Sequence, residues 1–143
     1  AFLKAIPAII RYPKGDEPEL PEPLKREGEM DIFRYGGNTI HWCLGTSISD
    51  ALSYSKKPDG VIDLRKAKPI DHNTLKKFSK NSSHWFVWED AQLIGGVGEA
   101  LSSFITENNL DIKLTQMGYP DNFIGHGKTD NLKIENRREI NQT

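Results

Sequence analysis

Hydrophobic and polar residues follow two different periods along most of this chain. Short apolar runs typical of strands recur between turn residues, and some have no polar face, as expected of strands buried on both sides. The predicted strands are residues 29–36, 39–45, 61–65, 84–88 and 111–118. Between them, apolar positions at helical spacing predict helices over residues 47–55 and 72–80, and a third helix that ends at Asn108-Asn109.

This order of elements predicts an α/β fold, specifically a three-layer α/β/α arrangement with right-handed crossovers. The first two strands are joined by too few residues for a parallel crossover, so we expect one strand to be antiparallel. The prediction is therefore a five-stranded mixed sheet with one antiparallel strand. The alternation of Ile112, Leu114 and Gln116 favours an edge position for the last strand, and Asp71 is the predicted N-cap of the second helix.

A glycine cluster follows the fourth predicted strand and is the most informative local motif. The strand ends at the acidic pair Glu89 and Asp90, and Gly95, Gly96 and Gly98 then precede a helix with Ala100, Leu101, Phe104 and Ile105 at inward spacing. Glycines allow close backbone approach and unusual turns, and such turns lie where ligands and partner subunits meet an α/β sheet. The motif lacks the spacing of a phosphate-binding loop, so helix–sheet packing explains it equally well.

The first part of the chain departs from the regular pattern. Residues 13–24 hold four prolines and four acids, a composition typical of a stiff linker. We therefore interpret residues 1–12 as a remnant of a preceding domain, with a short strand over residues 8–12, and residues 25–143 as the main domain. The start at Ala1, without methionine, leads us to expect a piece of a longer protein.

Composition excludes several classes of function. The 143 residues suit one domain with a sizeable core, and 19 basic residues against 20 acidic ones leave no basic footprint for nucleic acid. No apolar run is long enough to cross a bilayer, so no membrane partner is expected. The lone Cys43 lies in an apolar run, which predicts a buried thiol and fits a reducing compartment such as the cytoplasm.

Few residues suggest chemistry on their own. Arg11, close to Lys14, offers a fork of donors for a phosphate or carboxylate, but the spacing alone favours a surface arginine at the start of the linker. The four histidines form no i, i+4 pair, so no metal site is expected, and His126 is the histidine in a loop worth testing. Glu89 or Asp90 would be a general base or, more simply, a helix cap. The chain carries no complete catalytic motif.

Several segments together carry a family resemblance. They are residues 11–15 (RYPKG), 45–46 (GT) with 50–52 (DAL), 63–71 (DLRKAKPID), Glu89, 95–98 (GGVG) and 118–127 (GYPDNFIGHG). In this order they resemble the C-terminal part of the 1-deoxy-D-xylulose-5-phosphate synthase family, within the transketolase superfamily. Lys66 stands where the family has an aromatic residue, and Lys14 replaces the second arginine of its RYPRG motif.

The resemblance implies a thiamine-diphosphate-dependent transferase that joins pyruvate to glyceraldehyde 3-phosphate for isoprenoid and thiamine precursor synthesis. Thiamine diphosphate and magnesium would be held by missing N-terminal domains of the same polypeptide, so this chain alone would hold no cofactor and be inactive. Arg11 matches the arginine that binds the acceptor's phosphate, with Lys14 and His126 as accessory candidates. The main domain would serve packing and homodimer assembly, with Glu89 and the glycine cluster in structural or subunit contacts.

Two other interpretations stay open. Within the superfamily, the chain would be the matching domain of a transketolase or of a 2-oxoacid dehydrogenase beta subunit. Outside it, the same sheet would form a free-standing Rossmann-like binding or assembly module. The segments at 11–15 and 118–127 favour the synthase.

Overall fold

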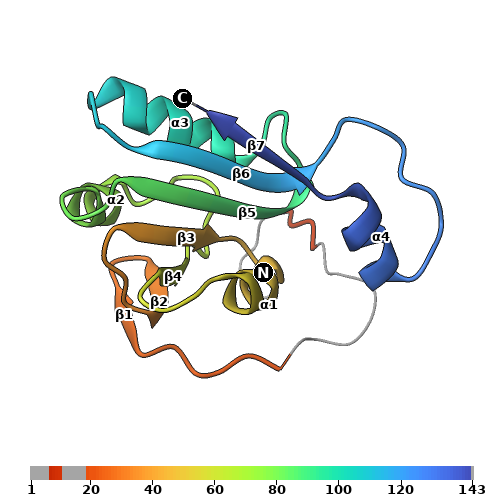
Figure 1. Cartoon of the computed structure of the whole chain (residues 1–143), viewed down its shortest axis with the longest axis horizontal. Helices are drawn as coiled ribbons and strands as arrows, with labels where there is room; N and C mark the ends of the chain where they lie inside the picture. The colour runs from red at the N-terminus through yellow and green to blue at the C-terminus, as the bar shows by residue number, and fades with distance from the viewer. Residues whose placement is uncertain (1–6, 11–18, 143) are drawn as a thin grey trace.

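The computed structural model describes residues 7–10 and 19–142, the last five of them by backbone alone. This part of the chain contains seven strands and four helices (Figure 1). The strands are β1 (Lys25–Glu27), β2 (Met30–Arg34), β3 (Thr39–Cys43), β4 (Gly60–Asp63), β5 (His84–Gln92), β6 (Lys113–Tyr119) and β7 (Arg138–Gln142). The helices are α1 (Ser47–Tyr54), α2 (His72–Ser79), α3 (Val97–Glu107) and α4 (Thr129–Asn136).

All the strands belong to one mixed sheet. Its order is β1-β2-β4-β3-β5-β6-β7, and the central strands β4, β3, β5 and β6 run parallel to one another. β1 and β2 continue the sheet antiparallel on one side, and β7 pairs antiparallel with β6 on the other. The parallel centre follows from the helical crossovers, since a parallel pair needs a long connection.

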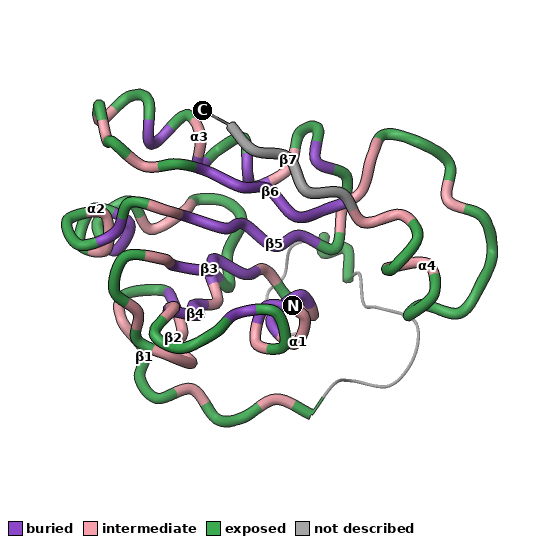
Figure 2. The backbone as a smooth tube through the Cα atoms, in the orientation of Figure 1, coloured by how far each residue is buried: buried purple, intermediate pink, exposed green. Residues whose placement is uncertain are grey.

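Helices cover both faces of the sheet and create two cores. One core joins α2 and α3 to the sheet through Leu75, Leu101 and Phe104, which pack with Trp42 and Trp85. The smaller core lies under α1. Its buried members are Cys43, Ile48, Ala51, Val61, Phe86, Trp88 and Met117. Figure 2 shows that burial is concentrated along the central strands and the inward faces of these helices.

Residues of β5 contribute to the two cores in turn. Trp85 and Val87 belong to the core under α2 and α3, whereas Phe86 and Trp88 belong to the core under α1. This alternation is what a strand with a period of two produces when both faces of a sheet are covered. The predicted three-layer α/β fold is therefore confirmed.

The number and direction of the strands differ from the prediction. The described residues form seven strands rather than five, and β1, β2 and β7 are all antiparallel to their neighbours. The predicted edge position of the last strand is wrong, because β6 lies between β5 and β7 and residues 114–118 are buried. The short β1 and the polar β7 carry too little hydrophobic pattern to signal strands from sequence.

Three local predictions are also corrected. Residues 8–10 of the predicted strand 8–12 are irregular and lie outside the sheet, and Ile9 is fully exposed; the remainder lies outside the described residues. β5 continues beyond Glu89 and Asp90 to Gln92, with an irregular register after Trp88. Ala100, predicted to face the sheet, is exposed.

The predicted helix boundaries are largely confirmed. Asp71 caps α2, since its carboxylate accepts hydrogen bonds from the backbone N–H groups of Asn73 and Thr74. Asn108 is the C-cap of α3, and Asn109 then takes a φ of 50°, a left-handed conformation that asparagine tolerates better than most residues.

Candidate functional site

The glycine turn, residues 95–98, is bound to the preceding strand β5 by hydrogen bonds at the carboxyl ends of the parallel strands. Glu89 lies within β5 and is buried, at 3% relative exposure. Its Oε2 accepts a hydrogen bond of 2.6 Å from the backbone N–H of Val97, and its Oε1 accepts one of 2.8 Å from that of Gly98. The carboxylate therefore caps the first turn of α3, where helices favour negative charge.

The glycines of the motif make room for this arrangement. A Cβ on Gly96 would lie 2.4 Å from Glu89 Oε2, and a Cβ on Gly98 would lie 2.4 Å from the side-chain oxygen of Gln116 on β6. Gly95 has a φ of 74°, which residues with a side chain rarely adopt. Gly95 is thus required by its backbone conformation, and Gly96 and Gly98 are required because a side chain there would collide with Glu89 or Gln116.

Opposing effects act on the pKa of Glu89. Burial raises the pKa of Glu89, while the hydrogen bonds from Gly98 and Val97 lower it and the negative charge of Glu99 raises it further, with a net upward shift. The start of α3 is thus occupied by a carboxylate of the same chain. An external phosphate or diphosphate does not fit at these two N–H groups while Glu89 holds them.

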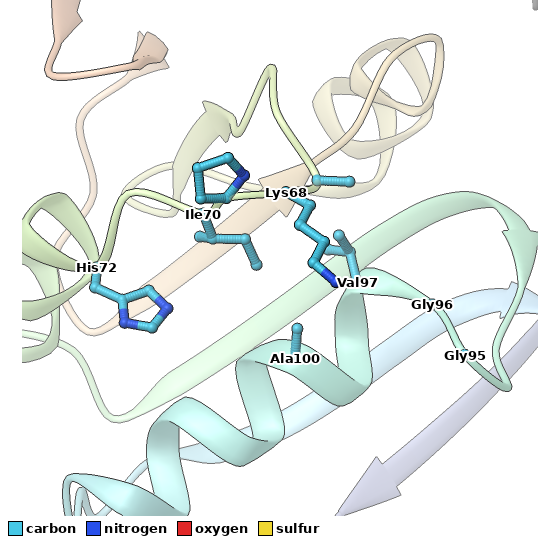
Figure 3. Close-up of a pocket in the computed structure, with 9 residues that line it drawn as sticks. Lys68, Ile70, His72, Gly95, Gly96, Val97 and Ala100 are labelled. Carbon is cyan, nitrogen blue, oxygen red and sulfur yellow. The ribbon is translucent and has the colours of Figure 1, made fainter. Parts of the chain in front are cut away.

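An open pocket lies beside this turn and brings two family-like segments together. Its volume is about 680 Å³, and it is lined from one side by Lys68, Ile70 and His72 and from the other by Val97 and Ala100. Figure 3 shows the Lys68 side chain directed toward Val97 at the start of α3. The pocket joins segment 63–71 to the glycine turn in space, and it combines an apolar lining with a cationic group at its rim.

A second cluster lies where α4 meets the carboxyl edge of the sheet. Asp50 of α1 accepts hydrogen bonds from Lys133 Nζ at 2.9 Å and from Arg137 Nη1 at 2.7 Å. The Arg137 guanidinium also lies over the rings of Trp88 and Tyr119, at 5.7 Å and 5.5 Å from their centroids. Sequence reasoning missed this cluster, because its members are far apart in the chain and belong to no motif.

His41 forms the polar centre of the core under α1. The Trp88 indole Nε1–H donates to His41 Nδ1 over 2.9 Å, and the His41 ring stacks on Phe86 with 4.6 Å between centroids. These contacts give His41 a structural role between β3 and β5, and its buried Nε2 makes no hydrogen bond of ordinary geometry.

The remaining predicted residues lie apart from these clusters. Arg11 and Lys14 fall outside the described residues. His126 lies on the exposed loop between β6 and α4, where it joins neither the glycine turn nor the Asp50 cluster. Cys43 is buried as predicted, and burial raises the pKa of its thiol well above the ordinary value.

A local hydrogen bond joins Asp63 to the Arg65 backbone. The Arg65 backbone N–H donates to Asp63 Oδ1 over 2.9 Å, and Arg65 Nε lies 3.4 Å from Asp31 Oδ2. Arg65 has a φ of 57°, so its backbone occupies the left-handed region that few non-glycine residues adopt.

Two kinds of feature are absent from the described part of the chain: a cluster of metal-binding side chains and a helix that could span a membrane. Within this part, no three His, Cys, Asp or Glu side chains gather in a way that could hold a metal ion. Among the same residues, no helix combines the length and apolar character needed to span a membrane.

Comparison with known proteins identifies the family. The sequence profile of the transketolase C-terminal domain matches residues 44–136. A curated 1-deoxy-D-xylulose-5-phosphate synthase from Aliarcobacter butzleri is 34% identical over 131 residues, which cover 86% of this chain and 22% of that protein. Synthases from Campylobacter jejuni subsp. doylei and Pseudomonas aeruginosa are 30% and 27% identical, over 99% and 90% of this chain.

The chain spans about a fifth to a quarter of these relatives, with 21–25% of their length covered. A solved structure with a similar fold is a split gene transketolase, described as an inactive beta4 tetramer. It superposes with a TM-score of 0.71 at 23% identity, covering 82% of this chain and 41% of that one. The profile match covers more than half of the chain, so the chain belongs to the transketolase C-terminal domain family.

Proposed function

We propose that this chain is the C-terminal domain of a 1-deoxy-D-xylulose-5-phosphate synthase. The complete enzyme would join pyruvate to glyceraldehyde 3-phosphate with release of carbon dioxide and supply a precursor for isoprenoid and thiamine synthesis. The observation that carries this proposal is the set of relatives named as this synthase, which align with 86–99% of the chain at 27–34% identity. The family-like segments at residues 11–15 and 118–127 favour the same assignment.

Within that enzyme, the domain would have an assembly role. The motif that most resembles a ligand-binding turn is used internally, because Glu89 caps α3 through the N–H groups of Val97 and Gly98. The pocket beside it is open and largely apolar, which suits contact with another protein surface. We infer that the glycine turn and segment 63–71 face the rest of the polypeptide or the second subunit of a homodimer.

Cofactor chemistry would then depend on the other domains. Thiamine diphosphate, with its magnesium ion, supplies the reactive carbanion in enzymes of this kind, and the protein binds and orients it. We propose that the N-terminal domains of the same cytoplasmic polypeptide hold both groups. This chain alone, residues 1–143, would be inactive.

The proposed division of the sequence follows the proline pattern. Residues 1–12 would close the preceding domain, residues 13–24 would link it to this one, and residues 25–143 would form the C-terminal domain. Arg11 would bind the acceptor's phosphate from the end of the preceding domain, with Lys14 as a second cation and His126 as an accessory group.

The test is an assay of the complete gene product that contains this segment. With pyruvate, glyceraldehyde 3-phosphate, thiamine diphosphate and Mg²⁺, we expect release of carbon dioxide and formation of 1-deoxy-D-xylulose 5-phosphate, while the 143-residue chain gives neither. Ketol transfer between sugar phosphates would instead assign a transketolase. Activity with lipoyl acceptors would assign a 2-oxoacid dehydrogenase, and a natural gene product of this length would favour a binding module.

Arg11 provides a sharper test of the substrate assignment. Losing a bidentate contact with a phosphate costs about 2 kcal/mol, or about thirtyfold in affinity. Arg11→Ala in the complete enzyme should therefore raise the KM for glyceraldehyde 3-phosphate about thirtyfold and leave that for pyruvate nearly unchanged. Equal increases in both KM values would contradict the proposed role.

A further inference from the structure

His41 makes a buried hydrogen bond with Trp88 that depends on the protonation state of the imidazole. Its Nδ1 accepts the indole N–H of Trp88 over 2.9 Å, so this nitrogen carries a lone pair and no proton. In the neutral ring the proton is then on Nε2, which faces Asp59 Oδ2 at 3.5 Å. The ring is enclosed by Phe86, stacked at 4.6 Å, and 1% of the His41 side chain is exposed.

Charged and titratable groups face His41 from every element around it. Asp59 approaches from the turn before β4 and favours the protonated ring, whereas Arg34 on β2 and His84 on β5 disfavour it. Tyr54 of α1 packs with its ring edge 6.1 Å from the imidazole centroid. Burial is the largest influence and lowers the pKa of His41, with Asp59 opposing it. His41 is therefore neutral at pH 7, and its contact with the indole is formed.

Trp88 connects His41 to the attachment of α4. The Arg137 guanidinium lies over the Trp88 ring at 5.7 Å and is bound to Asp50 at 2.7 Å. In the described part of the chain, α4 itself has no buried residue. Hydrogen bonds from Lys133 and Arg137 to Asp50, and the stacking of Arg137 on the Trp88 and Tyr119 rings, attach α4 to the domain.

We propose that His41 is an acid-sensitive latch that releases α4 from the carboxyl edge of the sheet. When Nδ1 takes up a proton from solvent, it becomes a donor and opposes the indole N–H that points at it. The imidazolium then favours Asp59, and Trp88 leaves its position. Arg137 then loses the Trp88 ring and keeps only the Tyr119 ring beneath it, and α4, held more weakly, opens together with the chain that leads into β7.

The direction of the effect follows from proton linkage. The folded pKa of His41 lies below its ordinary value of 6.5, so the unfolded chain binds more protons between the two values. The contribution of neutral His41 to the stability of the closed form is therefore complete above pH 6.5, and it is lost as the pH falls toward the folded pKa of His41. Between the two pKa values, the open form of α4 should gain up to about tenfold in population for each unit by which the pH falls, and below the folded pKa the gain levels off.

The test follows His41 and α4 in the same sample. Nuclear magnetic resonance of the 143-residue chain between pH 7.5 and 5 would report ring titration from the imidazole signals and helix opening from amide exchange, corrected for the intrinsic effect of pH. We expect the amides of residues 131–137 to lose protection from hydrogen exchange as the pH falls, with the same midpoint as the His41 titration. The amides of β5 should stay protected. Unchanged protection of α4, or loss with a different midpoint, would overturn the proposal.

Matched variants separate the latch from general acid destabilisation. Trp88→Phe keeps a ring beneath Arg137 but removes the indole N–H, so the acid response of α4 should disappear. His84→Gln removes the neighbouring titratable ring, and the response should persist. An acid response that survives in Trp88→Phe or vanishes in His84→Gln would refute the role of His41. If Trp88→Phe does not fold, the two midpoints of the wild-type chain decide the question.

Discussion

Removing the Glu89 carboxylate is the most direct test of how the glycine turn is built. In Glu89→Ala, the N–H groups of Val97 and Gly98 lose acceptors at 2.6 Å and 2.8 Å, and both residues are buried. A buried donor left without a partner costs about 1–3 kcal/mol. The charged carboxylate is itself disfavoured by burial, which raises its pKa, and water entering the space left by the side chain would restore part of the loss. We therefore expect a net loss of about 2–3 kcal/mol.

Urea unfolding of the 143-residue chain at pH 7, followed by tryptophan fluorescence, would measure this loss. Glu99→Ala is the matched control, because Glu99 is an exposed acid in the same first turn of α3 and contributes mainly through the helix dipole. Its removal should cost less than about 1 kcal/mol. Equal losses in the two variants would show that the hydrogen bonds of Glu89 do not stabilise the fold, and the proposed reason for the glycine cluster would fail.

Two further predictions concern the packing and capping of helices. In Gly98→Ala, the new Cβ would meet the side-chain oxygen of Gln116 at 2.4 Å, and we expect a loss of about 1–3 kcal/mol in the same urea assay. In Asp71→Ala, loss of the α2 N-cap should cost about 1 kcal/mol at pH 7. Hydrogen bonds from the Thr74 hydroxyl and nearby N–H groups hold the pKa of Asp71 below its ordinary 3.8, so this loss should vanish as the pH falls through the lowered value.

Each of these predictions has an outcome that contradicts it. A Cβ at Gly37 would meet no atom within 4 Å, so Gly37→Ala is the control for Gly98→Ala. If both glycine variants are equally stable, α3 does not depend on the close approach at Gly98. For Asp71, a stability difference that stays constant from pH 7 to pH 2 would mean that the ionised carboxylate is not the cap.

The regular part of the fold could be predicted because its signals are local. Strands β3 and β4 and the first part of β5 are mostly apolar and rich in β-branched or aromatic residues. The caps Asp71 and Asn108 lie next to the helices that they begin and end. The opposite orientation of Trp85 and Phe86 follows from the two-residue period of a strand. These features require no knowledge of which elements meet in space.

The sheet edges and the side-chain clusters could not be predicted, because they depend on long-range pairing. The alternation of Ile112, Leu114 and Gln116 predicts an edge position for β6, yet β7 pairs along it, and the polar sequence of β7 gives no period that would reveal this strand. Asp50 meets Lys133 and Arg137 only in the folded sheet, since these partners lie 83 and 87 positions away in the sequence. The contact between His41 and Trp88 likewise depends on the register of β3 against β5.

The role of Glu89 changes how such motifs should be recognised in other chains. The residue that decides whether the turn is free for a ligand lies eight positions before Val97, in the strand and outside the glycine cluster. A homologous sequence with the same glycines and a short neutral residue at that position would leave two helix amides pointing at an empty space. In this superfamily, the residue at this strand position should therefore be checked before a glycine turn is proposed as a phosphate site. An acid there indicates a helix capped by its own chain, and a short neutral residue indicates N–H groups that are free to bind an anion.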